Sequence, residues 1–177
     1  DPMSTPHSFV VVGAGNRGSG YAHFAVEHPD RMTVVGVAEP DEYRRAGMQQ
    51  LHQIPPENVF SDWQQLADRP RMADAAIIAT SDALHTEPAI ALARKGYHLL
   101  LEKPMAPTAE ECVRIVDEVK HADVMFAVCH VLRYTPYTRA LKQIVDSGKI
   151  GEIVNMQHLE PVGYWHIAHS FVRGNWR

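Results

Sequence analysis

Short apolar runs alternate with helical patterns along the first 130 residues of the chain. Several of these runs are apolar at consecutive positions, which is typical of parallel strands that helices cover on both faces. Strands and helices in this alternating order predict βαβ units, and therefore an α/β fold with a doubly wound parallel sheet. We expect the strands at these runs: Phe9–Val12, Thr33–Ala38, Val59–Phe60, Ala75–Ala79, His98–Leu101 and Val124–His130.

Helices are expected between these runs, and two of them carry N-terminal signals. Asp62 can cap a short helix that continues to Ala67. Thr108-Ala-Glu-Glu111 is a capping box, in which two side chains satisfy free N–H groups, and it opens a helix to about His121. The remaining helices are expected at Tyr21–His28, Asp41–Leu51 and Thr86–Lys95.

The pattern changes beyond residue 130. Pro136–Ser147 has the period of an amphipathic helix, a strand is expected at Glu152–Leu159, and the following tail has no clear period. We therefore divide the chain into a first domain at residues 1–130 and a second segment at residues 131–177. The second segment would hold an interdomain helix and the first strand of a truncated C-terminal α/β domain, because so few residues rarely bury a core of their own.

The composition is that of an ordinary globular protein, with 45% hydrophobic and 21% charged residues. A net charge of -4 gives no reason to expect nucleic acid as a partner. No apolar run approaches the roughly 18 residues of a membrane span, so we expect no membrane partner. The first strand begins by residue 9, which leads us to expect no signal peptide and a cytoplasmic location. Both cysteines, Cys112 and Cys129, are expected to be reduced thiols.

The first apolar run flows directly into Gly13-Ala-Gly15-Asn-Arg-Gly18, a G-x-G-x-x-G pattern. Gly13 allows the turn, Gly15 lets a pyrophosphate approach the backbone, and Gly18 lets the helix pack close to the sheet. A second strand follows and ends on Glu39, 21 residues after Gly18, where a carboxylate can bind ribose hydroxyls. The order predicts a Rossmann-type dinucleotide-binding domain. The alternative is a glycine-rich turn in another α/β protein, with Glu39 as a solvated acid.

Another strand ends in Glu102-Lys103-Pro104. Ligands of open α/β sheets bind outside the carboxyl ends of the strands, so Lys103 and the glycine loop should share one crevice. A partly desolvated lysine beside a cofactor can give or take a proton, because desolvation lowers its pKa. The alternative is a solvated loop lysine before a proline turn.

Glu39 also bears on the choice of nucleotide, because a carboxylate repels the 2′-phosphate of NADP. We therefore expect NAD as the cofactor, with NADP possible. Arg44 and Arg45 lie close enough in sequence to weaken this preference, although we favour a solvated helix face over phosphate binding as the explanation of both residues.

The histidine-rich tail raises the question of a metal site. His166 and His169 are three residues apart and His158 is nearby, a spacing that can place two ligands on one helical face. No cysteine or carboxylate pattern completes such a site, and we expect no metal. The aromatic residues of the tail are expected in contacts with a core or an interface: Tyr164, Trp165, Phe171 and Trp176.

Four motifs together resemble the glucose-fructose oxidoreductase and inositol dehydrogenase family (Gfo/Idh/MocA), over residues 8 to 160. The motifs occur in the family's order: Gly13-Ala-Gly-Asn-Arg-Gly18, Ala79-Thr80-Ser-Asp-Ala-Leu-His85, Glu102-Lys103-Pro104 and His130-Val-Leu-Arg133-Tyr-Thr-Pro136. The resemblance implies an NAD(P)-dependent oxidoreductase that acts on CH–OH groups of sugars, cyclitols or related polyols. It also implies a C-terminal domain built on an open sheet, through which members commonly form homo-oligomers.

The resemblance assigns roles to individual residues. Lys103 is implied to be catalytic, next to the nicotinamide and the reacting carbon, and Glu102 lies next to the ribose. Arg133 is implied to lie near the substrate, as is Lys103. The residues implied to bind the cofactor are Gly13, Gly15, Asn16, Arg17, Gly18, Glu39, Thr80, Ser81, Leu84, His85, Glu102 and Lys103.

The chain also departs from the family pattern. Members usually carry an Asp-x-x-x-His motif, or a close variant, beyond the first strand of the second domain, and it is not found before Arg177. The chain therefore looks like the amino-terminal half of such an enzyme. The alternative is a catalytically inactive nucleotide-binding module, acting as a sensor or a structural subunit.

Overall fold

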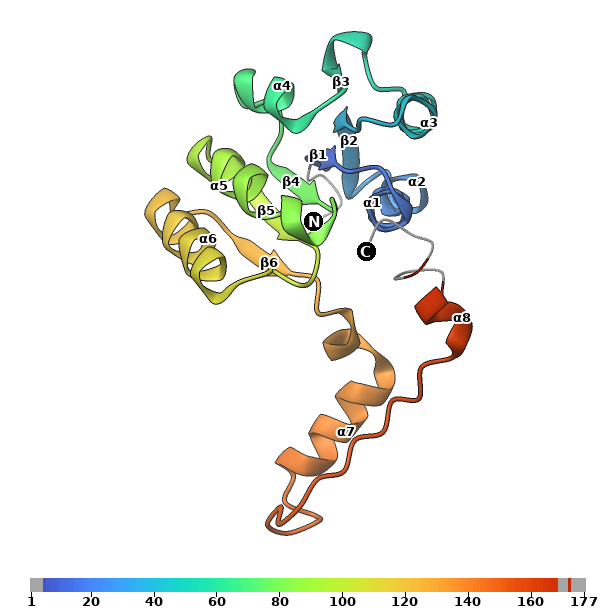
Figure 1. Cartoon of the computed structure of the whole chain (residues 1–177), viewed down its shortest axis with the longest axis vertical. Helices are drawn as coiled ribbons and strands as arrows, with labels where there is room; N and C mark the ends of the chain where they lie inside the picture. Colours follow the sequence, from blue (N-terminus) through green and yellow to red (C-terminus); the bar gives the residue numbers. More distant parts are fainter. Residues whose placement is uncertain (1–4, 169–171, 173–177) are drawn as a thin grey trace. The chain divides into compact units, whose positions relative to one another are not determined.

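The computed structural model describes residues 5–168 and 172. The chain divides into two compact units, the first ending at Cys129 and the second beginning at His130. The first unit is a parallel sheet with helices on both faces (Figure 1).

The sheet of the first unit has six strands in the order β3-β2-β1-β4-β5-β6, and every pair is parallel. This is the strand order of the Rossmann fold, and the order reverses between β1 and β4. The strands are β1 (His7–Val12), β2 (Met32–Ala38), β3 (Val59–Phe60), β4 (Ala75–Ile78), β5 (His98–Leu101) and β6 (Phe126–Val128).

Figure 1 shows α1, α2 and α3 on one face of this sheet and α4, α5 and α6 on the opposite face. Two short 3-10 helices, η1 (Pro56–Asn58) and η2 (Asp82–Leu84), complete the connections. The helices are α1 (Asn16–Ala22), α2 (Phe24–Glu27), α3 (Glu42–His52), α4 (Trp63–Asp68), α5 (Thr86–Arg94) and α6 (Ala109–Ala122).

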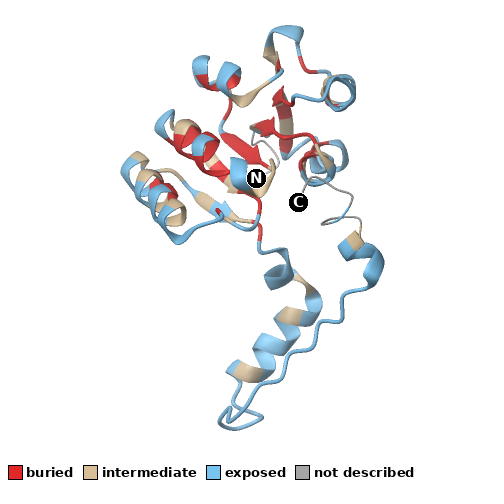
Figure 2. Cartoon of the chain, viewed as in Figure 1, coloured by how far each residue is buried: buried red, intermediate tan, exposed pale blue. Residues whose placement is uncertain are grey.

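Successive side chains along a strand pack into two separate hydrophobic cores, one on each face of the sheet. Val10 and Val12 pack with residues of α5 and α6, such as Leu92 and Ile115. Val11, between them, packs on the other face of the sheet, where α1 and α3 contribute. Figure 2 shows the buried residues concentrated in the central strands and in α5. Because both faces are covered, the central strands can be apolar throughout, as the sequence predicts.

The cap signals act as expected. The Asp62 carboxylate accepts the Gln65 N–H at 2.8 Å and begins α4. The Thr108 hydroxyl accepts the Glu111 N–H at 3.2 Å and donates to the Glu111 carboxylate at 3.0 Å, so the capping box of α6 is confirmed. These local bonds explain why the starts of both helices can be predicted from the sequence.

The largest differences from the predicted boundaries are at the first helix and the last strand of the first unit. The first helical segment begins at Asn16, inside the glycine motif, and is interrupted at His23. β6 is shorter than the expected Val124–His130, because it is an edge strand that pairs, among the described residues, with β5 alone. The pairing ends at Leu101↔Val128, where β5 itself ends.

The second unit contains η3 (Val131–Tyr134), α7 (Pro136–Asp146) and α8 (Tyr164–Ile167). The expected amphipathic helix is confirmed as α7, and Thr135 caps it by accepting the Thr138 N–H at 3.2 Å. None of the described residues from His130 onward is buried. Figure 2 shows the same contrast between the two units.

The strand expected at Glu152–Leu159 is wrong, because these residues have no regular secondary structure. The apolar side chains of Val154, Met156 and Leu159 are all exposed. A strand needs neighbouring strands for its backbone hydrogen bonds, and no strand is present among the described residues of this unit.

Three tail residues considered above for a metal site or for aromatic contacts lie outside the described residues: His169, Phe171 and Trp176. Tyr164 and Trp165 are described and are exposed. Across residues 5–168 and 172, none of the helices has both the length and the apolar character needed to cross a membrane.

Candidate functional site

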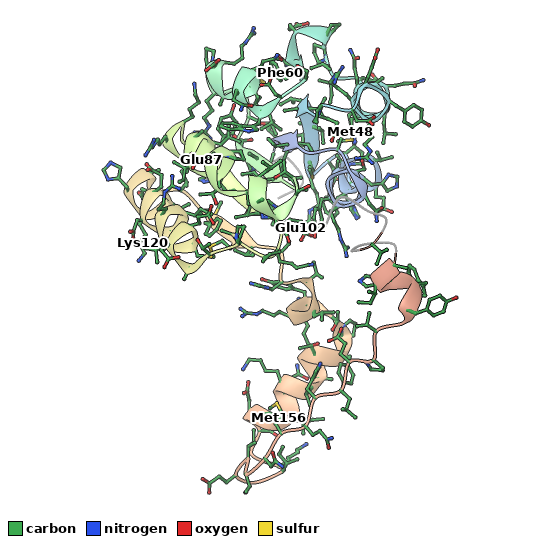
Figure 3. The ribbon with its side chains drawn as sticks, in the orientation of Figure 1. Met48, Phe60, Glu87, Glu102, Lys120 and Met156 are labelled. Carbon is green, nitrogen blue, oxygen red and sulfur yellow. The ribbon has the colours of Figure 1, made fainter. Side chains whose placement is uncertain are left out.

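The loops that follow the parallel strands of the first unit meet at one edge of the sheet. Val12 pairs with Ala38 and with Ile78, and Ile78 pairs with Leu101. The glycine loop, Glu39, Thr80 and Lys103 follow these four residues in the chain. The glycine loop and Lys103 therefore lie at the same edge of the sheet, as their shared site requires, and the crevice between them stays a prediction. Figure 3 labels Glu102 on this part of the unit.

Packing within the chain requires two of the three motif glycines. Gly13 has φ +89°, and a Cβ there would lie 2.7 Å from the Ala79 carbonyl oxygen. A Cβ on Gly18 would collide with the Gly13 carbonyl oxygen. Gly15 is different, because a Cβ there would meet only Arg44 Nη1, at 3.9 Å. The chain itself therefore leaves the space at Gly15 open.

The same loop leads into α1 without a side-chain cap. Gly15 occupies the N-cap position, and none of the side chains that the structure describes caps this first turn. The N–H groups at the start of a helix carry partial positive charge. Asn16 and Arg17, which form this first turn, therefore present a backbone suited to phosphate oxygens.

Glu39 is held by the backbone around it and is only 5% exposed. Its Oε2 accepts the Ala14 N–H at 2.5 Å, and its Oε1 accepts the Asp41 N–H at 3.0 Å. The carboxylate thus joins the end of β2 to the glycine loop. Each carboxylate oxygen can accept more than one hydrogen bond, so these contacts leave capacity for a ribose hydroxyl.

The two arginines that follow Glu39 differ in their contacts and in their exposure. Arg45 Nη1 donates to the carbonyl oxygens of Glu39 at 2.6 Å and Pro40 at 3.1 Å, and these bonds tie it to the backbone. Arg44 is exposed, and its Nη1 lies beside Gly15. Arg44 is therefore the one of the two that lies where a nucleotide would pass.

Glu102 is a second buried carboxylate at this edge, 6% exposed. The Tyr21 hydroxyl of α1 donates to its Oε1 at 2.6 Å, and Lys103 N–H donates to its Oε2 at 2.7 Å. Arg17 Nε lies 3.9 Å from Oε1. Burial raises the pKa of the Tyr21 phenol above its ordinary value, and the Glu102 and Cys129 side chains act in the same direction. The phenol therefore stays a hydrogen-bond donor to Glu102.

Lys103 itself is exposed, and the peptide bond that follows it, to Pro104, is cis. From the sequence we expect a partly desolvated lysine, but the described residues leave Lys103 exposed and do not supply that desolvation.

The residues of the segment between β4 and α5 differ in how far they are exposed to solvent. Thr80 and Ser81 are half-buried, and Leu84 is 58% exposed. His85 is 0% exposed, with Nδ1 2.8 Å from the Pro104 carbonyl oxygen and Nε2 3.1 Å from the Thr80 carbonyl oxygen. The first three can face a ligand, whereas the imidazole of His85 lies between two backbone segments.

Two residues of this edge were missed in the sequence. Burial raises the pKa of the Asp82 carboxyl, while the positive charge of Lys103 acts in the opposite direction. Its Oδ1 is buried and has no hydrogen-bond partner among the described residues. The other missed residue is Tyr21, four positions after Arg17. That spacing places both on one helix face, a signal that the two side chains could act together, although it does not identify Glu102 as their partner.

Arg133, implied to lie near the substrate, belongs to η3 of the second unit and is exposed. Its role stays a prediction.

The residues at the edge fit a dinucleotide. Gly15 leaves open space where a side chain would block a diphosphate, and the uncapped start of α1 offers N–H groups. The Glu39 carboxylate lies at the end of β2, where ribose hydroxyls are bound in this fold.

Comparisons with known proteins agree with this geometry. The model of an oxidoreductase family with an NAD-binding Rossmann fold matches residues 7–130. Levoglucosan dehydrogenase of Pseudarthrobacter phenanthrenivorans is 38% identical over 101 residues, covering 57% of this chain and 26% of that protein. Inositol 2-dehydrogenase 2 of Saccharopolyspora erythraea is 32% identical over 142 residues, covering 80% of this chain and 41% of that protein.

A solved structure is similar as well. The WlbA dehydrogenase from Bordetella pertussis, in complex with NADH and UDP-GlcNAcA, superimposes with a TM-score of 0.77 and 26% identity. The match covers 85% of this chain and 44% of that one. The chain spans less than half the length of these three proteins. Because the family model covers most of the chain, the chain belongs to the Gfo/Idh/MocA oxidoreductase family and carries its NAD-binding Rossmann domain.

Proposed function

We propose that the chain is the nucleotide-binding part of an NAD-dependent dehydrogenase that transfers hydride between the nicotinamide and a sugar, cyclitol or related polyol. The observation that carries the proposal is the meeting of the glycine loop and the Lys103 turn at one sheet edge. A domain that only bound a nucleotide would have no need for a lysine at that strand end. The relatives named above, a levoglucosan and an inositol dehydrogenase, support the substrate class.

In this proposal the loop from Gly13 to Gly18 and the start of α1 hold the diphosphate. Glu39 accepts hydrogen bonds from the adenosine ribose and disfavours the 2′-phosphate of NADP. Arg44, beside Gly15, is the residue through which NADP could still bind, because its guanidinium is exposed and positively charged. Thr80, Ser81 and Leu84 lie along the cofactor, and Glu102 lies beside its nicotinamide ribose.

The bound nicotinamide would supply the hydride chemistry. The carbinol oxygen of the substrate must lose a proton as the hydride leaves, and we assign that proton to the Lys103 amine. Lys103 suits this role because its side chain is exposed at the edge, while both neighbours in the chain are held by hydrogen-bonding side chains of other elements. Arg133 is the proposed substrate contact. A cytoplasmic location and a homo-oligomer formed through the C-terminal domain complete the proposal.

The test has a binding arm and a turnover arm. Titration of the chain with NADH and NADPH, followed by nucleotide fluorescence, should show tighter binding of NADH. Turnover is then measured in the natural protein at its full length, with levoglucosan and myo-inositol as probes. Lys103→Ala should lower kcat by about 10²–10⁴-fold, the usual contribution of a positioned acid or base.

Distinct outcomes contradict distinct parts of the proposal. Equal turnover by Lys103→Ala and the parent would remove the lysine from the mechanism. NADH binding without turnover on either probe would favour the inactive nucleotide-binding module. Tighter binding of NADPH would overturn the assignment of Glu39.

A further inference from the structure

Lys103 is exposed, yet the residues on both sides of it are held by side chains from other elements, the half-buried Tyr21 and the buried His85. Glu102, before it, accepts the Tyr21 hydroxyl of α1 at 2.6 Å. Pro104, after it, has its carbonyl oxygen 2.8 Å from Nδ1 of His85. These two contacts come from helices on opposite faces of the sheet (Figure 1).

The two holding residues are themselves fixed. His85 is fully buried at the N-cap of α5, a helix whose inner face is core. Tyr21 belongs to α1, which Gly18 packs tightly against the glycine loop. Glu102 is still part of the sheet edge, because its N–H donates to the Ile78 carbonyl oxygen at 2.8 Å. The chain leaves the sheet immediately after it.

We propose that His85 and Tyr21 are positioning residues for Lys103, which hold its two neighbours and so fix the point from which the amine reaches the substrate. For His85 this replaces the cofactor contact implied by the family resemblance. The inference rests on the proposed function for its catalytic meaning, but the placement of the turn can be measured without any substrate.

The distances also indicate which ring nitrogen of His85 donates a hydrogen bond. A neutral imidazole has one N–H, so only one of the two facing carbonyl oxygens can accept a hydrogen bond from it. Nδ1 is the closer of the two ring nitrogens to its oxygen, at 2.8 Å against 3.1 Å for Nε2 and Thr80. We therefore assign the proton to Nδ1 and the bond to Pro104.

This assignment can be tested with two matched variants. In asparagine, the side-chain amide nitrogen is separated from Cα by the same number of bonds as Nδ1 in histidine. In glutamine, it is separated from Cα by the same number of bonds as Nε2 in histidine. His85→Asn should therefore keep the bond to Pro104, whereas His85→Gln should lose it. Tyr21→Phe removes only the hydroxyl that donates to Glu102. His121→Gln, on the exposed end of α6, serves as the control.

The first readout is hydrogen exchange at the Lys103 amide of the chain, measured by NMR. Exchange should rise about tenfold in His85→Gln and in Tyr21→Phe, the change expected from one lost hydrogen bond. It should stay near the parent rate in His85→Asn and His121→Gln. The Val11 amide in the central strand β1 reports global unfolding. Equal exchange in His85→Asn and His85→Gln, or an equal rise at Val11, would overturn the proposal.

The second readout is turnover by the natural protein at its full length. Because a misplacement of about 1 Å can cost up to 10²-fold in rate, His85→Gln should lower kcat per NADH-binding site more than tenfold relative to His85→Asn, with the Kd of NADH unchanged. A purely structural role would lower the number of binding sites and not kcat per site. If Lys103→Ala proved fully active, the proposed function would fail while the exchange result would stand.

Discussion

At the scale of single residues, the three motif glycines are glycines for two different reasons. Gly13 and Gly18 are required by the chain, because a Cβ on either would overlap a backbone carbonyl. Gly15 has an ordinary negative φ of −68° and open space around it. Nothing in the described residues would exclude a side chain there. The proposed reason for that glycine is therefore the ligand.

This difference predicts opposite effects for two similar substitutions. Gly15→Ala should leave the melting temperature nearly unchanged, since substitutions without steric conflict usually fall within about 0.5 kcal/mol. It should weaken NADH binding at least about tenfold, because the methyl group occupies the diphosphate's place. Gly18→Ala should cost roughly 1–3 kcal/mol through overpacking, which corresponds to a fall in Tm of about 2–12 °C.

Thermal denaturation followed by circular dichroism and titration with NADH measure the two effects side by side. Gly20→Ala, in the same helix and with no atom near its Cβ position, is the control. An equal loss of stability in Gly15→Ala and Gly18→Ala would show that the chain needs both glycines, and would remove the argument that Gly15 is reserved for a ligand.

The sequence predicts the shared edge of the glycine loop and Lys103 because that edge depends only on the order of strands and helices. It does not predict the contacts that hold Lys103. The bond from Tyr21 to Glu102 depends on where α1 begins, and the contact of His85 with Pro104 depends on the path of the chain after β5. Both join residues that are far apart in sequence, so neither spacing nor composition indicates them.

At the scale of elements, a helix or strand can be predicted from the sequence when local hydrogen bonds fix its start or when neighbouring elements bury its apolar residues. The starts of α4 and α6 follow from side chains within three residues of each other. The central strands follow from apolar runs that two layers of helices bury. The strand expected at Glu152–Leu159 fails because an apolar run alone gives no hydrogen-bond partners to its backbone.

One side-chain contact ties two strands at their amino ends and makes a pH-dependent contribution to stability. The Asp74 Oδ2 atom, just before β4, accepts hydrogen bonds from the Ser8 N–H and the Ser8 hydroxyl, each at 2.8 Å. These two bonds, chiefly, lower the pKa of the Asp74 carboxyl below its ordinary value of 3.8. The folded protein therefore keeps this carboxylate charged at pH values where the unfolded chain takes up a proton.

The resulting stabilisation is complete above pH 3.8 and is lost as the pH falls through the lower pKa of the folded state. Asp74→Asn should accordingly lower Tm at pH 7, and the difference from the parent should shrink below about pH 4. Thermal melts at pH 7, 4 and 3 measure it, with Asp117→Asn on the exposed face of α6 as the control. A difference in Tm that stayed constant across these pH values would contradict the assignment.

At the scale of the whole molecule, every buried residue that the structure describes lies in the first unit. The two core clusters contain residues from Val10 to Val119, and the last buried residue is Cys129. Among the described residues after Cys129, many large apolar side chains are exposed, which is unusual for a self-contained domain. They are Val131, Leu132, Tyr134, Tyr137, Leu141, Ile144, Ile150, Ile153, Val154, Met156, Leu159, Val162, Tyr164, Trp165, Ile167 and Val172.

We propose on this basis that the domain boundary lies at residue 130, and a fragment of residues 1–130 tests it. Because the fragment retains every residue found buried in the described part of the chain, it should unfold cooperatively, with a Tm within about 4 °C of the parent chain, equivalent to roughly 1 kcal/mol. It should bind NADH as tightly as the parent, since the glycine loop, Glu39 and Lys103 all lie within it. The longer chain should self-associate more at high concentration in sedimentation experiments, because it exposes the apolar side chains that the fragment lacks. Loss of cooperative unfolding in the fragment would instead mean that residues after 130 complete the first unit, and the boundary would have to move.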